Sequence, residues 1–112
     1  MFLIVSKYLI PKGYAGMTVF PFVILKSKYY LDNKTTINHE KIHIRQQIEL
    51  LVLPFFVLYF GNLLINILRY RNFQMAYLNI VFEREAYANE KNLDYLKSRS
   101  FWRFLRYFSI KK

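Results

Sequence analysis

The only two histidines of this chain stand in one short motif, HEKIH at residues 39–43. On a helix, His39 and His43 project from the same face, one turn apart. That spacing allows both imidazoles to bind one zinc ion, at roughly 2.0–2.1 Å from each nitrogen. The surrounding sequence predicts a helix over about residues 35–53, because Pro54 disfavours its continuation. The motif therefore constrains the fold to one in which a helix carries a metal site.

Glu40 directly follows the first histidine, and on a helix it is rotated by about a quarter turn from it. The Glu40 carboxylate can therefore reach a water molecule held by the ion more easily than it can reach the ion. Zinc lowers the pKa of such a water from about 9 towards about 7. A nearby carboxylate can then accept the proton as the water attacks a carbonyl group. The motif predicts Zn²⁺ as the cofactor and Glu40 as the general base.

A hydrolytic zinc site needs a third protein ligand, and the chain has no cysteine to supply it. Glu49 is six residues past His43, too far along the same helix. Glu83 and Glu85 lie on a second predicted helix and point about 200° apart, so at most one of them faces the site. A buried carboxylate that is not a ligand would need a cation, which Arg45 or Arg84 could supply. Spacing alone leaves Glu83 and Glu85 open as the third ligand, with Asp32, which precedes the motif helix, as a less supported alternative.

HEKIH followed by EREAY, at residues 83–87, resembles the gluzincin branch of the zincin metallopeptidases. In that family the third ligand is a glutamate on a second helix, often in an E-x-x-A-D context. The resemblance implies Glu83 as the ligand, with Glu85 as the alternative. Tyr87 stands where an aspartate usually supports a ligand histidine, so a weaker hydrogen bond, donated by the imidazole and accepted by the Tyr87 hydroxyl, is implied. The resemblance covers residues 38–47 and 83–89, and it implies hydrolysis of a peptide or protein substrate.

Two further features flank the motif. Gln46 shares the helix face of the histidines, so its amide either hydrogen-bonds an imidazole or contacts solvent. The apolar stretch Met17–Leu25 precedes the helix and contains Pro21, which favours an edge strand or an extended segment. It is either an edge that pairs with an extended peptide or an ordinary core strand.

The order of elements predicts an α+β fold that is mostly helical, in a single domain over residues 1–112. We expect a strand region over residues 1–34 and a helical metal-site core over residues 35–96. A long helix is expected over residues 73–96, and a basic, aromatic helix over residues 97–112.

The segment Leu50–Leu68 is almost wholly apolar, close to the roughly 20 residues that span a bilayer. Asn62 and Asn66 would be unfavourable against lipid, so a buried helix pair bent at Pro54 or Gly61 is favoured over a span. Both interpretations remain open at this stage.

The chain has 17 Lys and Arg against 7 Asp and Glu, a formal charge of +10. In the tail, basic and aromatic residues alternate at helical spacing, which is typical of contact with an anionic membrane surface. The residues expected at this surface are Arg99, Trp102, Arg103 and Arg106. The alternative is that the apolar stripe packs onto the domain. Binding of the tail to nucleic acid is a third, weaker hypothesis, because no recognised binding motif is present.

The sequence thus predicts zinc-dependent hydrolysis of peptide bonds, on a membrane or in the cytoplasm. The alternative is a non-enzymatic, membrane-associated protein whose metal site is structural or degenerate.

Overall fold

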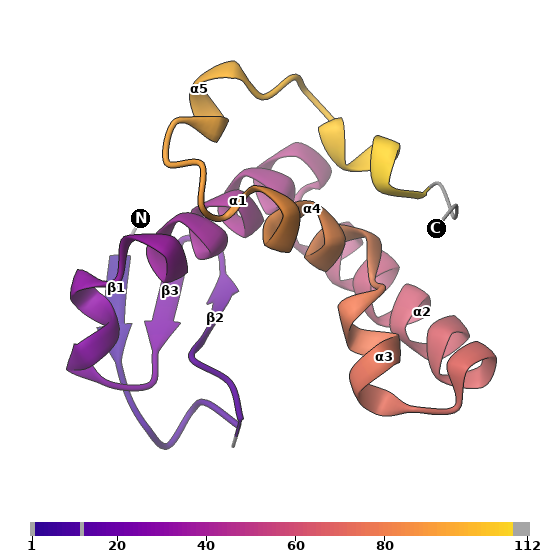
Figure 1. The fold of residues 1–112 in the computed structure, drawn as a ribbon, viewed down its shortest axis with the longest axis horizontal. Coiled ribbons are helices and arrows are strands. Elements are labelled where there is room, and N and C mark those ends of the chain that lie inside the picture. Colours follow the sequence, from indigo (N-terminus) through magenta and orange to yellow (C-terminus); the bar gives the residue numbers. More distant parts are fainter. Residues whose placement is uncertain (1, 12, 109–112) are drawn as a thin grey trace.

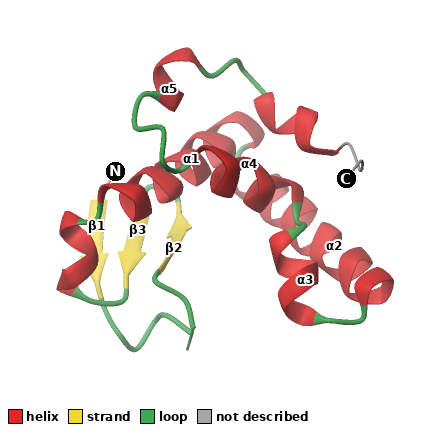
Figure 2. Cartoon of the chain, viewed as in Figure 1, coloured by secondary structure: helices red, strands yellow, loops and turns green. Residues whose placement is uncertain are grey.

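The computed structural model describes residues 2–11 and 13–108. A small sheet is formed by the N-terminal residues, and helices make up most of the remaining chain (Figure 1). The predicted α+β, mostly helical fold is confirmed. The sheet lies at one side of the molecule, and the longest helix extends away from it (Figure 2).

The sheet has three strands, β1 (Phe2–Val5), β2 (Gly16–Val19) and β3 (Phe22–Leu25), in the order β1-β3-β2. β3 pairs in parallel with β1 and antiparallel with β2, which leaves β2 at an edge. The stretch Met17–Leu25, expected as an edge strand or an extended segment, forms two strands instead of one because the chain reverses between Val19 and Phe22, and the first of them, β2, lies at an edge. Proline lacks the N–H that a ladder needs, and it therefore lies in the turn rather than in a strand.

The motif helix is α1 (Lys34–Leu50), which follows a short 3-10 turn, η1 (Lys28–Asp32). The side chain of Asn33 caps α1 by accepting a hydrogen bond from the N–H of Thr36 at 3.1 Å. α1 ends before Pro54, at Leu50, and α2 (Val52–Tyr70) begins after Leu51. Pro54 lies in the first turn of α2, where its missing N–H breaks no helical bond.

The predicted long helix over residues 73–96 is wrong. The chain instead forms α3 (Phe73–Leu78), α4 (Val81–Asn89) and the single turn α5 (Tyr95–Ser98). At the break, the side chain of Asn79 donates to the carbonyl of Met75, and the N–H of Val81 donates to Asn62 Oδ1 of α2 at 2.7 Å. Side-chain amides that satisfy backbone groups in this way compete with a continuous helix. The break turns α4 towards α1, against which it packs.

The apolar segment forms α2, a helix long and apolar enough to cross a membrane by length and composition. The predicted buried, bent helix pair is wrong, because α2 is one helix and most of its residues are not buried. Its inner face contributes Phe55 to the main hydrophobic cluster, with Ile80, Phe82 and Phe104.

The predicted tail helix over residues 97–112 is also wrong. The chain turns at Arg99 and then forms a 3-10 turn, η2 (Arg103–Phe108), while residues 109–112 lie outside the described part of the chain. Arg99 is buried by ion pairs with two carboxylates, so it is not a surface contact. Trp102 and Arg106 are exposed and Arg103 is half-buried.

Candidate metal centre

Helices α1 and α4 pack together (Figure 1). His39 and His43 of α1 meet Glu83 of α4 there. One ligand atom from each of the three lies within 4.8 Å of the others, and all three residues are buried. The Nε2 atoms of His39 and His43 lie 3.2 and 3.1 Å from Glu83 Oε1. The helical spacing of the motif accounts for the first two side chains, and the break before α4 brings in the third.

A carboxylate fixes the tautomer of His39. Its Nδ1 lies 2.7 Å from Glu90 Oε1, an atom that accepts hydrogen bonds when ionised. The proton of a neutral His39 therefore resides on Nδ1, and Nε2 presents a lone pair towards Glu83. This is the arrangement by which proteins usually orient a metal-binding histidine.

The amide of Gln46 fixes the tautomer of His43 in the same way. The Gln46 nitrogen donates to the carbonyl of Phe82 at 3.1 Å and to Glu85 Oε1 at 2.9 Å, so the orientation of the amide is determined. Its oxygen lies 2.8 Å from His43 Nδ1 and accepts the proton there. Nε2 of His43 thus also presents a lone pair towards Glu83. The contact between Gln46 and His43 is the first of the two alternatives drawn from their shared helix face.

Three hydrogen-bond acceptors consequently converge with no donor among them. Such a group needs either a cation or added protons at its centre. Burial lowers the pKa of His43, but the charge and hydrogen bond of Glu83, together with the charge of Glu40 and the hydrogen bond of Gln46, raise it from 6.5 to about 9. Burial raises the pKa of Glu83, but the two imidazoles lower it by more, so the pKa of Glu83 lies well below its usual range. Two imidazole nitrogens and one carboxylate oxygen are a ligand set that suits zinc.

Glu40 lies beside this group without belonging to it. Its Oε1 accepts a hydrogen bond of 2.5 Å from the Thr18 hydroxyl of β2. Gln47 holds the same strand against α1, since its amide nitrogen donates to the carbonyl of Thr18 at 2.9 Å and its oxygen accepts from the N–H of Phe20 at 2.6 Å. The buried Glu40 carboxylate therefore has a fixed position beside the ligands.

The contacts of Gln47 bear on the substrate-edge alternative for β2. The N–H of Lys26 donates to the carbonyl of Ala15, so the backbone groups of the odd-numbered residues Ala15 to Val19 point towards β3. The backbone groups of Thr18 and Phe20 therefore point away from β3. Gln47 uses the outward groups of Thr18 and Phe20. Gln47 thus occupies two of the backbone groups to which a peptide paired with β2 would bond, the Thr18 carbonyl and the Phe20 N–H.

A pocket of about 510 Å³ opens in front of the ligands, between β2 and α2. Its polar members are Thr18, Gln47 and Glu40 together with the three ligand residues. The other residues that line it are largely aromatic and aliphatic, and they include Tyr14, Phe55, Phe56, Tyr59, Phe60, Leu63, Phe73 and Tyr77. A wall of this kind suits large apolar side chains beside the metal centre.

Glu85, the alternative ligand, faces away from the cluster. Arg99 donates to both of its oxygens and also to Glu49 Oε2 at 2.6 Å, and the Tyr95 hydroxyl donates to Glu85 Oε2 at 2.6 Å. Burial raises the pKa of Glu85, but the hydrogen bonds from Arg99 hold it below its ordinary value. The cation that this carboxylate needs is Arg99, rather than Arg45.

Tyr87 does not support a ligand histidine through its hydroxyl. Its ring packs against His39 at a centroid distance of 4.5 Å, and its hydroxyl lies 3.3 Å from that of Tyr77. Glu90 makes the contact that was expected from Tyr87. It was missed because it follows the last residue of α4, where helical spacing no longer predicts direction.

Tyr59 is a second residue that the sequence did not single out. Its hydroxyl donates to Glu83 Oε2 at 2.5 Å, which leaves the other oxygen of this carboxylate facing the histidines. The only signal was a hydroxyl group within an otherwise apolar run.

No family model, no curated protein and no solved structure matches this chain. The chemistry of the site is therefore inferred from its residues and their geometry.

Proposed function

We propose that this protein binds Zn²⁺ through His39, His43 and Glu83 and hydrolyses peptide bonds, with Glu40 as the general base. The observation that carries the proposal is the convergence of three buried lone-pair donors whose orientations are fixed by Glu90, Gln46 and the Tyr59 hydroxyl. These residues fit a zinc ion, because the Nε2 atoms of the neutral imidazoles direct their lone pairs at the Glu83 carboxylate, and a bound ion would displace the proton that Glu83 stabilises on His43.

Bound zinc would supply a Lewis acid that polarises a carbonyl and acidifies water. Glu40 accepts the proton of the attacking water and then donates it to the leaving amine. Thr18 holds the Glu40 carboxylate in place for both transfers, and the buried setting strengthens the electrostatic interactions of the site. The apolar pocket favours a substrate with a large apolar side chain next to the scissile bond.

The first experiment measures the metal content of the purified full-length protein by elemental analysis. We expect about one zinc per chain, and loss of this zinc in His39→Ala and in Glu83→Gln. Asp94→Asn is the matched control, because it removes a carboxylate from an exposed position. A wild-type protein that takes up no metal in excess zinc would overturn the proposal.

The second experiment separates metal binding from catalysis. Glu40→Gln should retain zinc and lose hydrolysis of a peptide library by about 10³-fold or more, since the base is removed and the ligands are not. Zinc binding with no hydrolysis by the wild-type chain would favour the alternative, a structural metal site in a non-enzymatic protein.

A further inference from the structure

One side of α2 is an exposed apolar stripe, which we call the α2 outer face. Its residues follow helical spacing and are all aliphatic or aromatic: Leu53, Val57, Phe60, Leu64, Ile65 and Leu68. Leu53 is 74%, Val57 66% and Leu68 71% exposed. Large contiguous apolar surfaces of this kind usually mark a binding site for protein or membrane.

The two asparagines of α2 turn away from this face. Asn62 accepts a hydrogen bond from the N–H of Val81, and Asn66 donates to the carbonyl of Ala76 at 3.1 Å. Their inward orientation removes the objection that these two residues raised against contact with lipid. Along the described helix, about five turns long, the outer face offers no hydrogen-bonding side chain.

The lack of hydrogen-bonding side chains on the α2 outer face favours a lipid over a protein as its partner. A protein–protein interface usually carries about one hydrogen bond per 100–200 Å² and has a polar rim. Hydrocarbon requires neither, and it accepts a helix whose backbone groups are bonded within the helix. The inner face of α2 packs on α1, α3 and α4, so one face alone is available to lipid, as in helices that lie in a membrane interface.

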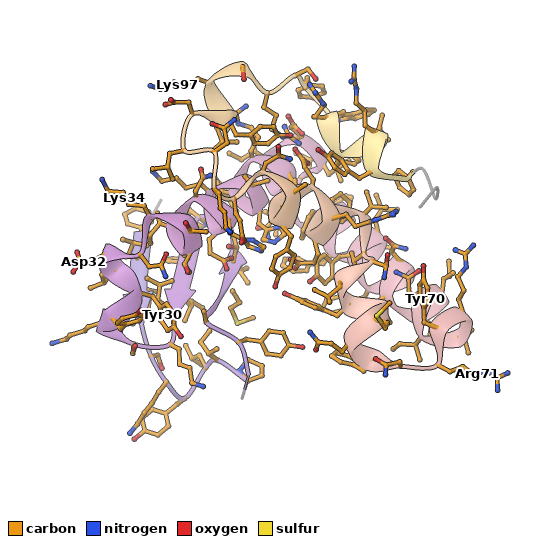
Figure 3. All side chains as sticks on the ribbon, viewed as in Figure 1. Tyr30, Asp32, Lys34, Tyr70, Arg71 and Lys97 are labelled. Atoms are coloured by element: carbon orange, nitrogen blue, oxygen red, sulfur yellow. The ribbon has the colours of Figure 1, made fainter. Side chains whose placement is uncertain are left out.

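The charges near α2 complement an anionic surface. Between Glu49 and Glu83 the sequence has no acidic residue, and its basic residues there are Arg69 and Arg71. Tyr70 and Arg71 project from the far end of α2, remote from the acidic side chain Asp32 beside the sheet (Figure 3). Tyrosine and arginine at one end of an apolar helix are typical of the headgroup level.

Trp102 lies near the other end of α2 and is also a residue that favours the membrane interface. Its indole nitrogen donates to the carbonyl of Glu49 at 3.3 Å, which places it beside the junction of α1 and α2 while its ring stays partly exposed. Tryptophan is enriched at the boundary between hydrocarbon and headgroups. The apolar stripe is thus bordered at both ends by residues that favour the interface.

We propose that the α2 outer face inserts into the apolar region of an anionic lipid bilayer, with Arg69 and Arg71 among the headgroups. This membrane contact goes beyond the proposed peptidase activity and does not depend on it. It also differs from the contact predicted from the tail, where Arg99 is buried in ion pairs. Phe60 belongs both to this face and to the wall of the metal-site pocket, so the pocket opens beside the bilayer.

The test is co-sedimentation of the full-length protein with vesicles of phosphatidylcholine alone or mixed with phosphatidylglycerol. We expect binding to the mixed vesicles that weakens with salt, and a decrease of about tenfold or more in Leu64→Glu, since the substitution puts a charge into hydrocarbon. Leu93→Glu is the matched control, because Leu93 is 50% and Leu64 58% exposed, and Leu93 lies between α4 and α5. Its binding should change less than twofold.

Two more variants separate the sources of attraction. Arg69→Gln with Arg71→Gln should weaken binding to the anionic vesicles about threefold to thirtyfold, at roughly 1 kcal/mol per basic residue near the surface, and leave binding to neutral vesicles unchanged. Arg103→Gln with Arg106→Gln should have a smaller effect.

Three outcomes would overturn the proposal. One is a wild-type protein that binds neither kind of vesicle. Another is loss of binding in the tail variant while Leu64→Glu binds normally. The third is a wild-type dimer in sedimentation velocity that Leu64→Glu dissociates, which would assign the face to a second copy of the chain.

Discussion

The metal centre and the α2 outer face reverse the usual distribution of side chains in opposite ways. Between α1 and α4, histidines and carboxylates are buried and hydrogen-bonded to partners of fixed orientation. On α2, large apolar side chains are exposed. A buried polar group or an exposed apolar patch is more informative than the reverse arrangement, because each is unfavourable unless something compensates for it. In the first region the chain supplies the hydrogen bonds and ion pairs and lacks only an ion at the centre of His39, His43 and Glu83, whereas in the second all of the compensation must come from outside.

The prediction with the largest expected effect removes a buried cation that pairs with buried carboxylates. Arg99→Met leaves the buried carboxylates of Glu85 and Glu49 without their cation. We expect the free energy of unfolding to fall by about 3–5 kcal/mol, as it does when one partner of a buried pair is lost. Urea unfolding followed by circular dichroism measures it. Lys97→Met, which removes an exposed cation, should change stability by less than about 0.5 kcal/mol. Equal effects of the two variants would contradict the assignment of Arg99 as the cation that Glu85 and Glu49 need.

A second test supplies the ion that the three converging acceptors require. A ligand that binds only the folded state stabilises it by about 2.7 kcal/mol when its free concentration is 100-fold above Kd. For a chain of this size that corresponds to a rise of roughly 10 °C in Tm. We expect zinc to raise the Tm of the wild type and chelator to reverse the rise. In Glu83→Gln the rise should be absent, and an undiminished rise there would rule out Glu83 as a ligand.

The orientation of His39 allows a finer test within the same region. Removing a residue that fixes a ligand histidine commonly lowers metal affinity 10–100-fold. We therefore expect Glu90→Ala to raise the Kd for zinc by that factor, measured by competition with a chromogenic chelator. Glu90→Gln should keep part of the affinity, since its amide oxygen still accepts from Nδ1. Tyr87→Phe should change the Kd less than twofold, and a larger loss there than in Glu90→Ala would restore the role predicted for Tyr87.

The sequence predicted the parts of the site that depend on local spacing. His39 and His43 lie on one face of a helix because residues four apart do so in any helix, and Glu83 followed from the resemblance of its motif. Gln46 contacts His43 for the same local reason. The fold class was also predictable, because the switch from strand-like to helical patterns occurs once along the chain.

Several features that the sequence did not predict depend on contacts between distant residues. The break before α4 is stabilised by Asn62, 19 residues earlier. Arg99 compensates Glu49 from 50 residues away. Neither contact leaves a periodic pattern, so the continuous helix over residues 73–96 and the surface position of Arg99 were reasonable inferences from local rules alone. Tertiary contacts overrode them.

The smallest expected effect concerns the α2 outer face in solution. Leu64 is exposed, so Leu64→Glu removes little packing from the isolated protein, and we expect its unfolding free energy to change by less than about 0.5 kcal/mol in urea. On the opposite face, Phe55→Ala should lose about 3–5 kcal/mol, because Phe55 is fully buried. A strong loss of stability in Leu64→Glu would mean that another surface already covers this face in solution. A small change, combined with loss of vesicle binding, would mean that the outer face contributes to association with the bilayer and not to folding.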